Sequence, residues 1–134
     1  MDTYGTNRTC RSRARTAAGI DHVRLSYQYL DAGDVDAYGS LLDQDVQIRH
    51  PGFPIRRGRA EVLRTRAATG PPGRHDIHRI IAEGDDIAVV GVFTPPTAPD
   101  VGDPRHGTDF VDIFTLTEHG LLRSCERFYR VAPL

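Results

Sequence analysis

The spacing of the apolar residues changes near position 70 of this chain of 134 residues. Before that point, apolar residues recur three and four positions apart, as in Ile20, Val23, Tyr27 and Leu30, which is the spacing of one helix face. After it, apolar and polar residues alternate, which is typical of strands with one buried face. Helices followed by a run of antiparallel strands predict an α+β fold, with the helices packed on one face of a curved sheet.

The individual elements follow from this pattern and from the glycines and prolines. Helices are predicted over residues 20–30, 35–42 and 59–68, and a strand over residues 45–51 that stops at Pro51. Two hairpins follow: residues 74–85 pair with 86–94, and residues 106–116 pair with 121–132. The proline-rich segment 95–105 and residues 52–58 are predicted to be loops.

Residues 1–19 are predicted to be a flexible, arginine-rich tail, and residues 20–134 a single domain. The tail has almost no large apolar side chain to bury, and it lacks the apolar run of a signal peptide. A second interpretation stays open, in which its arginines form a basic arm for an anionic partner: Arg8, Arg11, Arg13 and Arg15.

The composition sets limits on the class of partner and on the compartment. A net charge of −1 gives no reason to expect nucleic acid or a membrane surface as a partner. No apolar run approaches the length of a membrane-spanning helix. Two distant cysteines, Cys10 and Cys125, match neither a disulfide framework nor a zinc pattern, so we expect a cytoplasmic protein.

Three stretches in this order carry a family resemblance: "YLDAGDVDAYGSLLDQDVQIRHP", "RRGRAEVLR" and "DIFTLTEHGLLRS". From Ile20 to Val131 the chain resembles the nuclear-transport-factor-2-like superfamily. More narrowly, it resembles the SnoaL-like branch with its polyketide cyclases and related ketosteroid isomerases. The resemblance implies a cone-shaped barrel, in which a strongly bent sheet wraps around the N-terminal helices and leaves a deep pocket at its open end. It also implies a homodimer formed through the outer sheet face.

The same resemblance implies roles for two residues. Asp112 matches the oxyanion-hole aspartic acid of the ketosteroid isomerases, and His50 matches the position of their general-base aspartate. The chain departs from the pattern elsewhere. Ser26 stands at the position of the isomerase tyrosine, with Tyr27 one residue later, and Arg127 stands where related epoxide hydrolases have an Asp. The Trp that the cyclases often carry in the last strand is absent.

Asp112 is the strongest candidate for chemistry on physical grounds as well. It shares one strand face with Phe110 and Phe114, and burial between two rings raises the pKa of a carboxyl. Such an acid can donate a hydrogen bond to a carbonyl or exchange a proton near neutral pH. The alternative is a structural one, in which Asp112 forms an ion pair with an arginine, Arg127 being the first candidate.

His50 and the last strand supply the other candidates. His50 ends a strand, where an imidazole can remove a proton at neutral pH, or where it is simply a polar strand end. Arg127 and Tyr129 share a face with Cys125, and they can hold an enolate or carboxylate oxygen if that face lines the pocket. The predicted pocket wall comprises Phe110, Phe114, Tyr27 and Cys125.

The remaining histidines and arginines give weaker signals. His75 and His78 lie three apart on a strand, so they should point to opposite faces and share no metal. His106 lies in a loop, where it can reach the pocket rim. Three arginines before the third predicted helix form either a solvated face or a site that attracts an anionic substrate: Arg56, Arg57 and Arg59.

Two functional hypotheses follow. The first is an enzyme without cofactor or metal that cyclises or isomerises a hydrophobic or aromatic small molecule in polyketide or related natural-product biosynthesis. His50 or Asp112 removes a proton next to a carbonyl, and Arg127 or Tyr129 stabilises the enolate oxygen. The second is a non-catalytic protein of the same fold that binds a hydrophobic ligand or shields a reactive intermediate.

Overall fold

The computed structural model describes residues 3–96 and 107–130, with side chains from residue 13 onward within these ranges. The helices are α1 (Thr3–Ala32), α2 (Val35–Gly39) and α3 (Arg59–Thr69). The strands are β1 (Leu42–Arg49), β2 (Arg56–Arg57), β3 (Arg74–Glu83), β4 (Asp86–Thr94), β5 (Thr108–Leu116) and β6 (Leu122–Tyr129). The predicted order of helices followed by strands is therefore confirmed.

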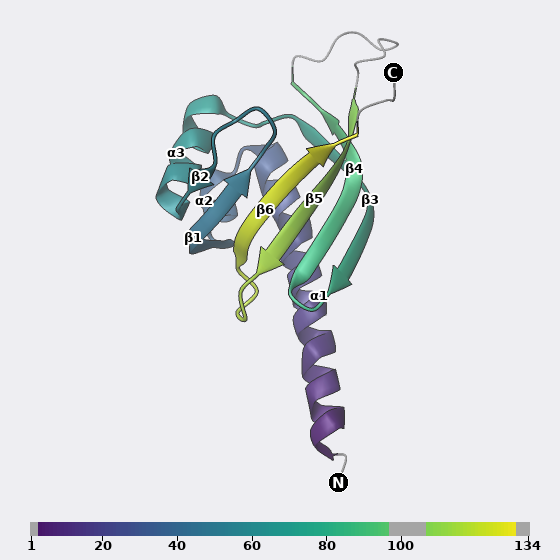
Figure 1. The fold of residues 1–134 in the computed structure, drawn as a ribbon. Helices are drawn as coiled ribbons and strands as arrows, with labels where there is room; N and C mark the ends of the chain where they lie inside the picture. Colours follow the sequence, from purple (N-terminus) through teal and green to yellow (C-terminus); the bar gives the residue numbers. More distant parts are fainter. Residues whose placement is uncertain (1–2, 97–106, 131–134) are drawn as a thin grey trace.

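The strands form one curled sheet in the order β2-β1-β6-β5-β4-β3. All neighbouring pairs are antiparallel except β1 and β6, which are parallel. Helix α1 passes behind the sheet in Figure 1, while α2 and α3 lie beside its β1–β2 edge. The structure is thus an α+β fold whose bent sheet has the helices on one face, as the sequence predicts.

The core fills the space between α1 and the concave sheet face. Val23 of α1, Val89 of β4 and Phe110 of β5 are each at most 1 % exposed. Along β5 the buried and more exposed residues alternate, as expected for a strand with one covered face. Asp112 lies on the buried side of this strand, at 1 % exposure.

The predicted start of the first helix at Ile20 is wrong, because α1 begins at Thr3. Ala and Arg are good helix formers, and no proline interrupts the segment before Ile20. The helix touches the domain before that residue: Gly19 is buried beside Leu116, and the Arg15 guanidinium lies 2.9 Å from the Asp85 carboxylate. The predicted tail is therefore partly the start of α1.

Two local features also differ from the prediction. Residues 52–58 are not entirely loop, because Arg56 and Arg57 form β2 and pair with β1. Strand β3 has a bulge between Ile77 and Arg79, so the simple alternation that we predicted is broken. Most of the predicted loop 95–105, together with His106, lies outside the described residues.

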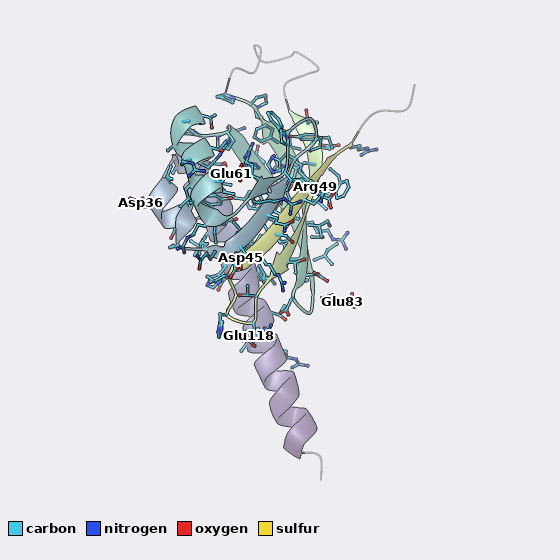
Figure 2. The ribbon with its side chains drawn as sticks, turned by 60° about the vertical axis from the view of Figure 1, so that its left-hand side comes forward. Asp36, Asp45, Arg49, Glu61, Glu83 and Glu118 are labelled. Atoms are coloured by element: carbon cyan, nitrogen blue, oxygen red, sulfur yellow. The ribbon has the colours of Figure 1, made fainter. Side chains whose placement is uncertain are left out.

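Charged side chains are distributed widely over the molecule. Figure 2 labels acidic and basic residues on α2, β1, α3, β3 and the turn after β5, and they lie on different parts of the surface. This spread agrees with the net charge of −1. Within the described residues, none of the helices combines the length and the apolar character that crossing a membrane requires.

Candidate functional site

A cavity of about 580 Å³ lies between α1, α3 and the concave face of the sheet. This volume is in the range of small-molecule sites. Most of its wall is apolar, and the wall includes Leu30, Ile48, Val62, Phe93, Phe114 and Leu122. A few polar groups interrupt this wall, so the cavity suits a largely hydrophobic ligand with a small number of polar atoms.

All but one of the residues predicted for the site line this cavity. They are His50, Asp112, Arg127, Tyr129, Tyr27, Phe114 and Cys125. The exception is Phe110, which is 1 % exposed and packs beneath the Arg127 guanidinium, 4.5 Å from its ring centroid. The face of β6 that carries Cys125, Arg127 and Tyr129 is therefore the inner one.

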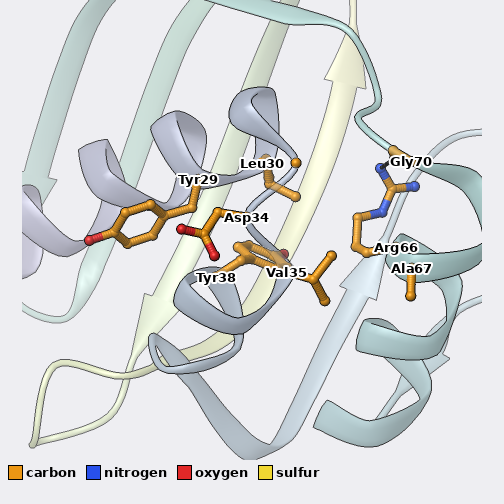
Figure 3. Close-up of a pocket in the computed structure, with 9 residues that line it drawn as sticks. Tyr29, Leu30, Asp34, Val35, Tyr38, Arg66, Ala67 and Gly70 are labelled. Atoms are coloured by element: carbon orange, nitrogen blue, oxygen red, sulfur yellow. Dashed lines mark hydrogen bonds between the residues drawn. The ribbon is translucent and has the colours of Figure 1, made fainter.

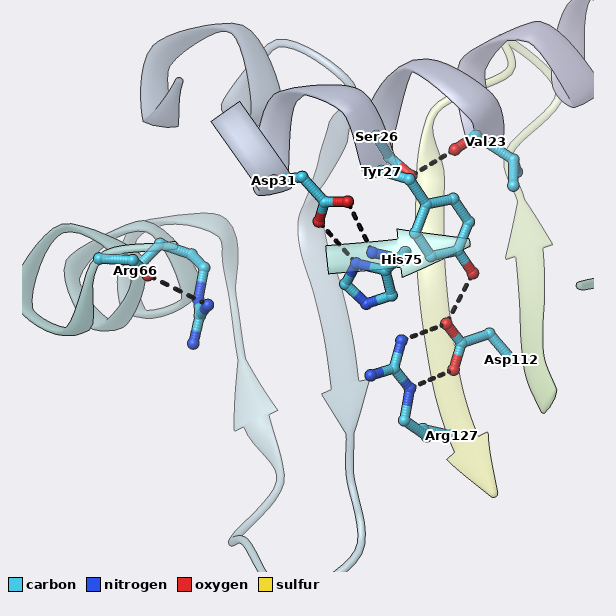
Figure 4. A network of polar contacts seen from close by, with 9 residues as sticks. Val23, Ser26, Tyr27, Asp31, Arg66, His75, Asp112 and Arg127 are labelled. Atoms are coloured by element: carbon cyan, nitrogen blue, oxygen red, sulfur yellow. Dashed lines mark hydrogen bonds and ion pairs between the residues drawn. The ribbon is translucent and has the colours of Figure 1, made fainter. Parts of the chain in front are cut away.

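Asp112 is fully engaged by two neighbours. The Arg127 Nε donates to Asp112 Oδ1 at 2.8 Å, and Arg127 Nη2 donates to Oδ2 at 2.7 Å (Figure 4). The Tyr27 hydroxyl donates to the same Oδ2 at 2.6 Å. This geometry is the structural alternative considered for Asp112: an ionised carboxylate in a bidentate pair. Its oxygens are therefore poorly placed to exchange protons with a ligand.

The pair also sets the charge state of its neighbours. Burial alone lowers the pKa of Arg127, but the hydrogen bonds and negative charge of Asp112 raise it above its ordinary value. Burial, followed by the charge of Asp112, raises the pKa of the Tyr27 hydroxyl, so Tyr27 stays protonated. Arg127 is thus a permanent cation inside the cavity, and two hydrogen bonds to Asp112 use only part of its donor capacity.

His50 is held in its neutral form. Burial first, and the positive charge of Arg127 second, lower the pKa of His50 to about 4. At neutral pH its imidazole therefore has one N–H donor and one acceptor nitrogen. A neutral imidazole near a cation can donate a hydrogen bond to a carbonyl oxygen, and its basicity is similar to that of a carboxylate.

His75 is a site residue that the sequence did not reveal. Asp31, near the end of α1, accepts two hydrogen bonds from it: from the backbone N–H at 2.8 Å, and from ring Nδ1 at 2.6 Å (Figure 4). We assign the ring proton to Nδ1, because an ionised carboxylate has no proton to donate and can only accept a hydrogen bond from this nitrogen. In the neutral tautomer with this proton, Nε2 has the lone pair, and the ring lines the cavity.

Aromatic rings fix the orientation of this imidazole. The His75 side chain is 2 % exposed, and its ring lies 4.9 Å from the centroids of both Tyr27 and Phe93. Phe110 meets it edge-on at 5.6 Å. Phe93 and Phe110 also contact the Arg127 guanidinium. His75 and Arg127 therefore share one aromatic wall of the cavity.

The environments of Cys125 and His78 do not favour a catalytic role or a role as a metal ligand. Burial raises the pKa of the Cys125 thiol, which makes it a small core residue, not a nucleophile. His78 is exposed while His75 is buried, as predicted for residues that point to opposite faces. Within the described residues, no three His, Cys, Asp or Glu side chains gather as a metal site would require.

The sequence and the fold were also compared with known proteins. A family model described as a SnoaL-like domain matches residues 23–124. No curated protein sequence matches the chain significantly. The solved structures that are similar include a candidate ketosteroid isomerase from Kribbella flavida, with 23 % identity and a TM-score of 0.71, covering 89 % of this chain and 82 % of that one.

Two further solved structures have the same fold. An NTF2-like protein of unknown function from Burkholderia xenovorans is 19 % identical, with a TM-score of 0.69, and the match covers 89 % of this chain and 90 % of that one. TerC, co-crystallised with polyporic acid, is 20 % identical, with a TM-score of 0.69 and coverages of 84 % and 92 %. At these identities the likeness concerns the fold alone.

Proposed function

The chain belongs to the SnoaL-like domain family, and from this premise we propose that it is a cofactor-independent cyclase or isomerase. Its substrate is a hydrophobic or aromatic small molecule with a carbonyl group, of the polyketide or related natural-product class. One observation carries the proposal: an imidazole oriented by a carboxylate, His75 with Asp31, shares an apolar cavity with the permanent cation Arg127.

His75 is the proton acceptor in this mechanism. Asp31 holds the Nδ1–H, so in the neutral ring Nε2 is the nitrogen that accepts a proton from a ligand in the cavity, and the carboxylate stabilises the imidazolium that forms. This assignment replaces Asp112, whose oxygens are occupied by Arg127 and Tyr27.

Arg127 and His50 stabilise the negative charge that develops on the carbonyl oxygen. The guanidinium is already oriented by Asp112, so it requires little reorganisation during the reaction. His50, neutral at pH 7, donates a second hydrogen bond to the same oxygen. Tyr129 lines the same wall. The Arg127 Cζ atom lies 5.8 Å from the centroid of the Tyr129 ring, so this ring supports the guanidinium.

The proton and electron balance of the step is simple. The proton on the carbon next to the carbonyl moves to His75 Nε2, and the C–H electron pair becomes the enolate double bond while the carbonyl π electrons move to oxygen. In an isomerisation of a β,γ-unsaturated ketone the enolate is a dienolate: the imidazolium returns the proton to the γ-carbon, the carbonyl re-forms, and the C=C bond moves to the α,β position. In a cyclisation the enolate carbon attacks a second carbonyl carbon of the same molecule, and the new alkoxide receives the proton.

The family fold offers support for the kind of ligand. TerC was co-crystallised with polyporic acid, so a protein of this fold can be crystallised with an organic acid. The cavity of about 580 Å³ and its aromatic wall of Tyr27, Phe93 and Phe114 suit a ligand with fused or linked rings. We infer the ligand class from these features, and the specific substrate is open to test.

The test uses a reaction that needs no knowledge of the natural substrate. Exchange of the α-protons of 2-tetralone in D₂O, followed by ¹H NMR, reports enolate formation on a bicyclic ketone. We expect the wild-type protein to accelerate exchange at least about 10²-fold over His75→Asn. Asn places an amide N–H where Nδ1–H lies, so the variant keeps the Asp31 anchor but lacks a proton acceptor.

Two controls complete this test. His78→Asn changes the exposed histidine of the same strand and should exchange at the wild-type rate. Thermal unfolding should show that His75→Asn is folded. Wild-type exchange no faster than that of His75→Asn, with 2-tetralone shown to bind, would favour the second hypothesis, a non-catalytic ligand-binding or shielding protein.

We further infer that two copies associate through the outer face of the sheet. Ile113, Phe128 and Ile81 are 38 %, 50 % and 48 % exposed on β5, β6 and β3. Ala88 of β4 pairs with both Ile113 and Ile81, so these three side chains form a row across β3, β4 and β5. Phe128 pairs with Val111, two residues before Ile113 on β5, and so lies beside this row. An apolar row on an exposed antiparallel sheet is a natural contact surface for a second copy.

A further inference from the structure

We propose that the ligand of this cavity carries an anionic group, such as a carboxylate, that binds between Arg56 and Arg66. This inference rests on the proposed function, because it assigns a second polar end to the same substrate. Arg56 belongs to β2 and Arg66 to α3, and both side chains line the cavity. In Figure 4, Arg66 lies well apart from Arg127, so the anionic end and the reacting carbonyl occupy different parts of the ligand.

Arg66 has unused hydrogen-bonding capacity at a buried atom. Its Nε is buried and has no hydrogen-bond partner, which is unusual for a polar atom inside a protein. Its Nη1 makes only a long bond of 3.4 Å to the Gly70 carbonyl oxygen. Within the part of the chain that the structure describes, no carboxylate lies within ion-pair distance of Arg66.

The position of Arg66 gives its guanidinium access to ligand space on two sides. It lines the large cavity and also a smaller one of about 110 Å³, shown in Figure 3, between α1, α2 and α3. Asp34 lines the smaller cavity, but its Oδ1 accepts the Ala37 N–H as the cap of α2. The guanidinium is thus held at the boundary of the large cavity without a neutralising partner.

Arg56 adds a second positive charge at the same place. Burial first, and the charge of Arg56 second, lower the pKa of Arg66, so the two cations oppose each other across the site. The Arg56 guanidinium lies 5.8 Å from the Phe53 ring centroid, and among the described residues no carboxylate lies within ion-pair distance of it. Glu61 also lines the cavity; its Oε2 accepts the backbone N–H of Arg57, and among the described residues it forms no ion pair with Arg56 or Arg66.

An anion between the two guanidinium groups would satisfy the unpartnered Arg66 Nε and reduce the repulsion between Arg56 and Arg66. It would accept a hydrogen bond from the orphaned Arg66 Nε, and it would offset the repulsion between like charges. Guanidinium groups match the two oxygens of a carboxylate geometrically. Arg127 already has the carboxylate partner Asp112, whereas Arg66 has no carboxylate partner among the described residues.

The experiment compares two probes that differ only in charge. Binding of 2-naphthoate and 2-naphthamide is measured by isothermal titration calorimetry on the full-length protein. We expect 2-naphthoate to bind at least about tenfold more tightly. Arg66→Gln and Arg56→Gln should each reduce this preference to less than about threefold, because each removes one of the two cations.

Matched controls come from the neighbouring arginines. Arg64 of α3 and Arg57 of β2 are exposed and do not line the cavity, so Arg64→Gln and Arg57→Gln should keep the tenfold preference. If Arg66→Gln fails to fold, Arg56→Gln carries the test alone, because among the described residues the Arg56 side chain contacts only the Phe53 ring, and the backbone pairing of β2 with β1 is unchanged by the substitution.

The outcomes separate this inference from the proposed function. Equal binding of the two probes, or a preference that survives both Arg56→Gln and Arg66→Gln, overturns the anionic site while the cavity remains a ligand site. If neither probe binds, the cavity is not a site for aromatic ligands, and the inference and the proposed function both fail.

Discussion

Asp112 and Arg127 face each other across β5 and β6 and are joined by two buried hydrogen bonds of 2.8 Å and 2.7 Å. The carboxylate between two phenylalanines is therefore explained by its partner on the next strand. The pair is enclosed by Phe110 beneath the guanidinium and by the Tyr27 hydroxyl on the carboxylate. The sequence left two interpretations of Asp112 open, a desolvated acid and an ion-pair partner of Arg127, and the structure shows the ion pair.

Breaking this pair should be costly to the fold. Asp112→Asn leaves the Arg127 charge buried at 5 % exposure without a counterion, and we expect a loss of about 3–5 kcal/mol in the free energy of unfolding. Tyr27→Phe removes one hydrogen bond to the carboxylate but keeps the ion pair, so it should cost less, about 1.5–3 kcal/mol. Urea denaturation measures both, and an Asp112→Asn protein as stable as the wild type would mean that the pair contributes nothing.

The sequence predicted the sheet well because the alternation of apolar and polar residues is a strong signal for strands with one buried face. The pattern along residues 86–94 and 106–116 predicted two strands, which the structure has at Asp86–Thr94 and Thr108–Leu116. The face shared by Cys125, Arg127 and Tyr129 is the inner one. The start of α1 was not predictable in the same way. Its first turns present few apolar side chains, so no periodic pattern distinguishes a helix from a tail there.

The Asp31–His75 pair could not be read from the sequence for two physical reasons. The residues are 44 positions apart, so only the docking of α1 on β3 brings them together. The bulge near His78 also disturbs the alternation that would mark His75 as an inward residue. Arg66 was hidden in the same way, because its helix has mainly exposed residues and only Val62 is fully buried.

The pH dependence of stability should report the environment of His50. The folded protein holds the pKa of His50 at about 4, against an ordinary value of 6.5 in the unfolded chain. Between these values the unfolded state binds more protons, so stability falls as the pH drops from about 6.5 to about 4 and this contribution is flat below that.

The size of this effect is measured as the difference in unfolding free energy between the wild type and a His50 variant, so that the contribution of the titrating carboxylates is the same in both and cancels. Between pH 7 and pH 5 the wild type should lose about 2 kcal/mol more than His50→Asn. His119 lies in an exposed turn, and His119→Asn should follow the wild-type curve. Parallel curves for the wild type and His50→Asn would show that His50 is not kept neutral by the fold.

Removal of the first turns of α1 should have a small effect. Residues 13–18 are exposed or half-buried, and the Arg15–Asp85 ion pair is 44 % exposed on both sides, so a deletion of residues 1–18 should lower the melting temperature by only a few degrees. A deletion of residues 1–24 removes Val23, which is 0 % exposed, and should unfold the domain. A large loss of stability in the shorter deletion would mean that the early turns of α1 are part of the core.

The proposed dimer is tested on its exposed apolar row. We expect the wild type to be a dimer at micromolar concentration in size-exclusion chromatography with light scattering. Ile113→Glu combined with Phe128→Glu places like charges at the contact, and it should weaken association at least about 100-fold without changing the circular dichroism spectrum. Phe53 is 63 % exposed in the loop after β1, away from the outer sheet face, so Phe53→Glu is the matched control and should remain dimeric. A wild-type protein that is monomeric at micromolar concentration would contradict the proposed dimer.

A double variant that stayed dimeric would show that the two copies associate through another surface, because this face cannot bury two glutamates from each copy.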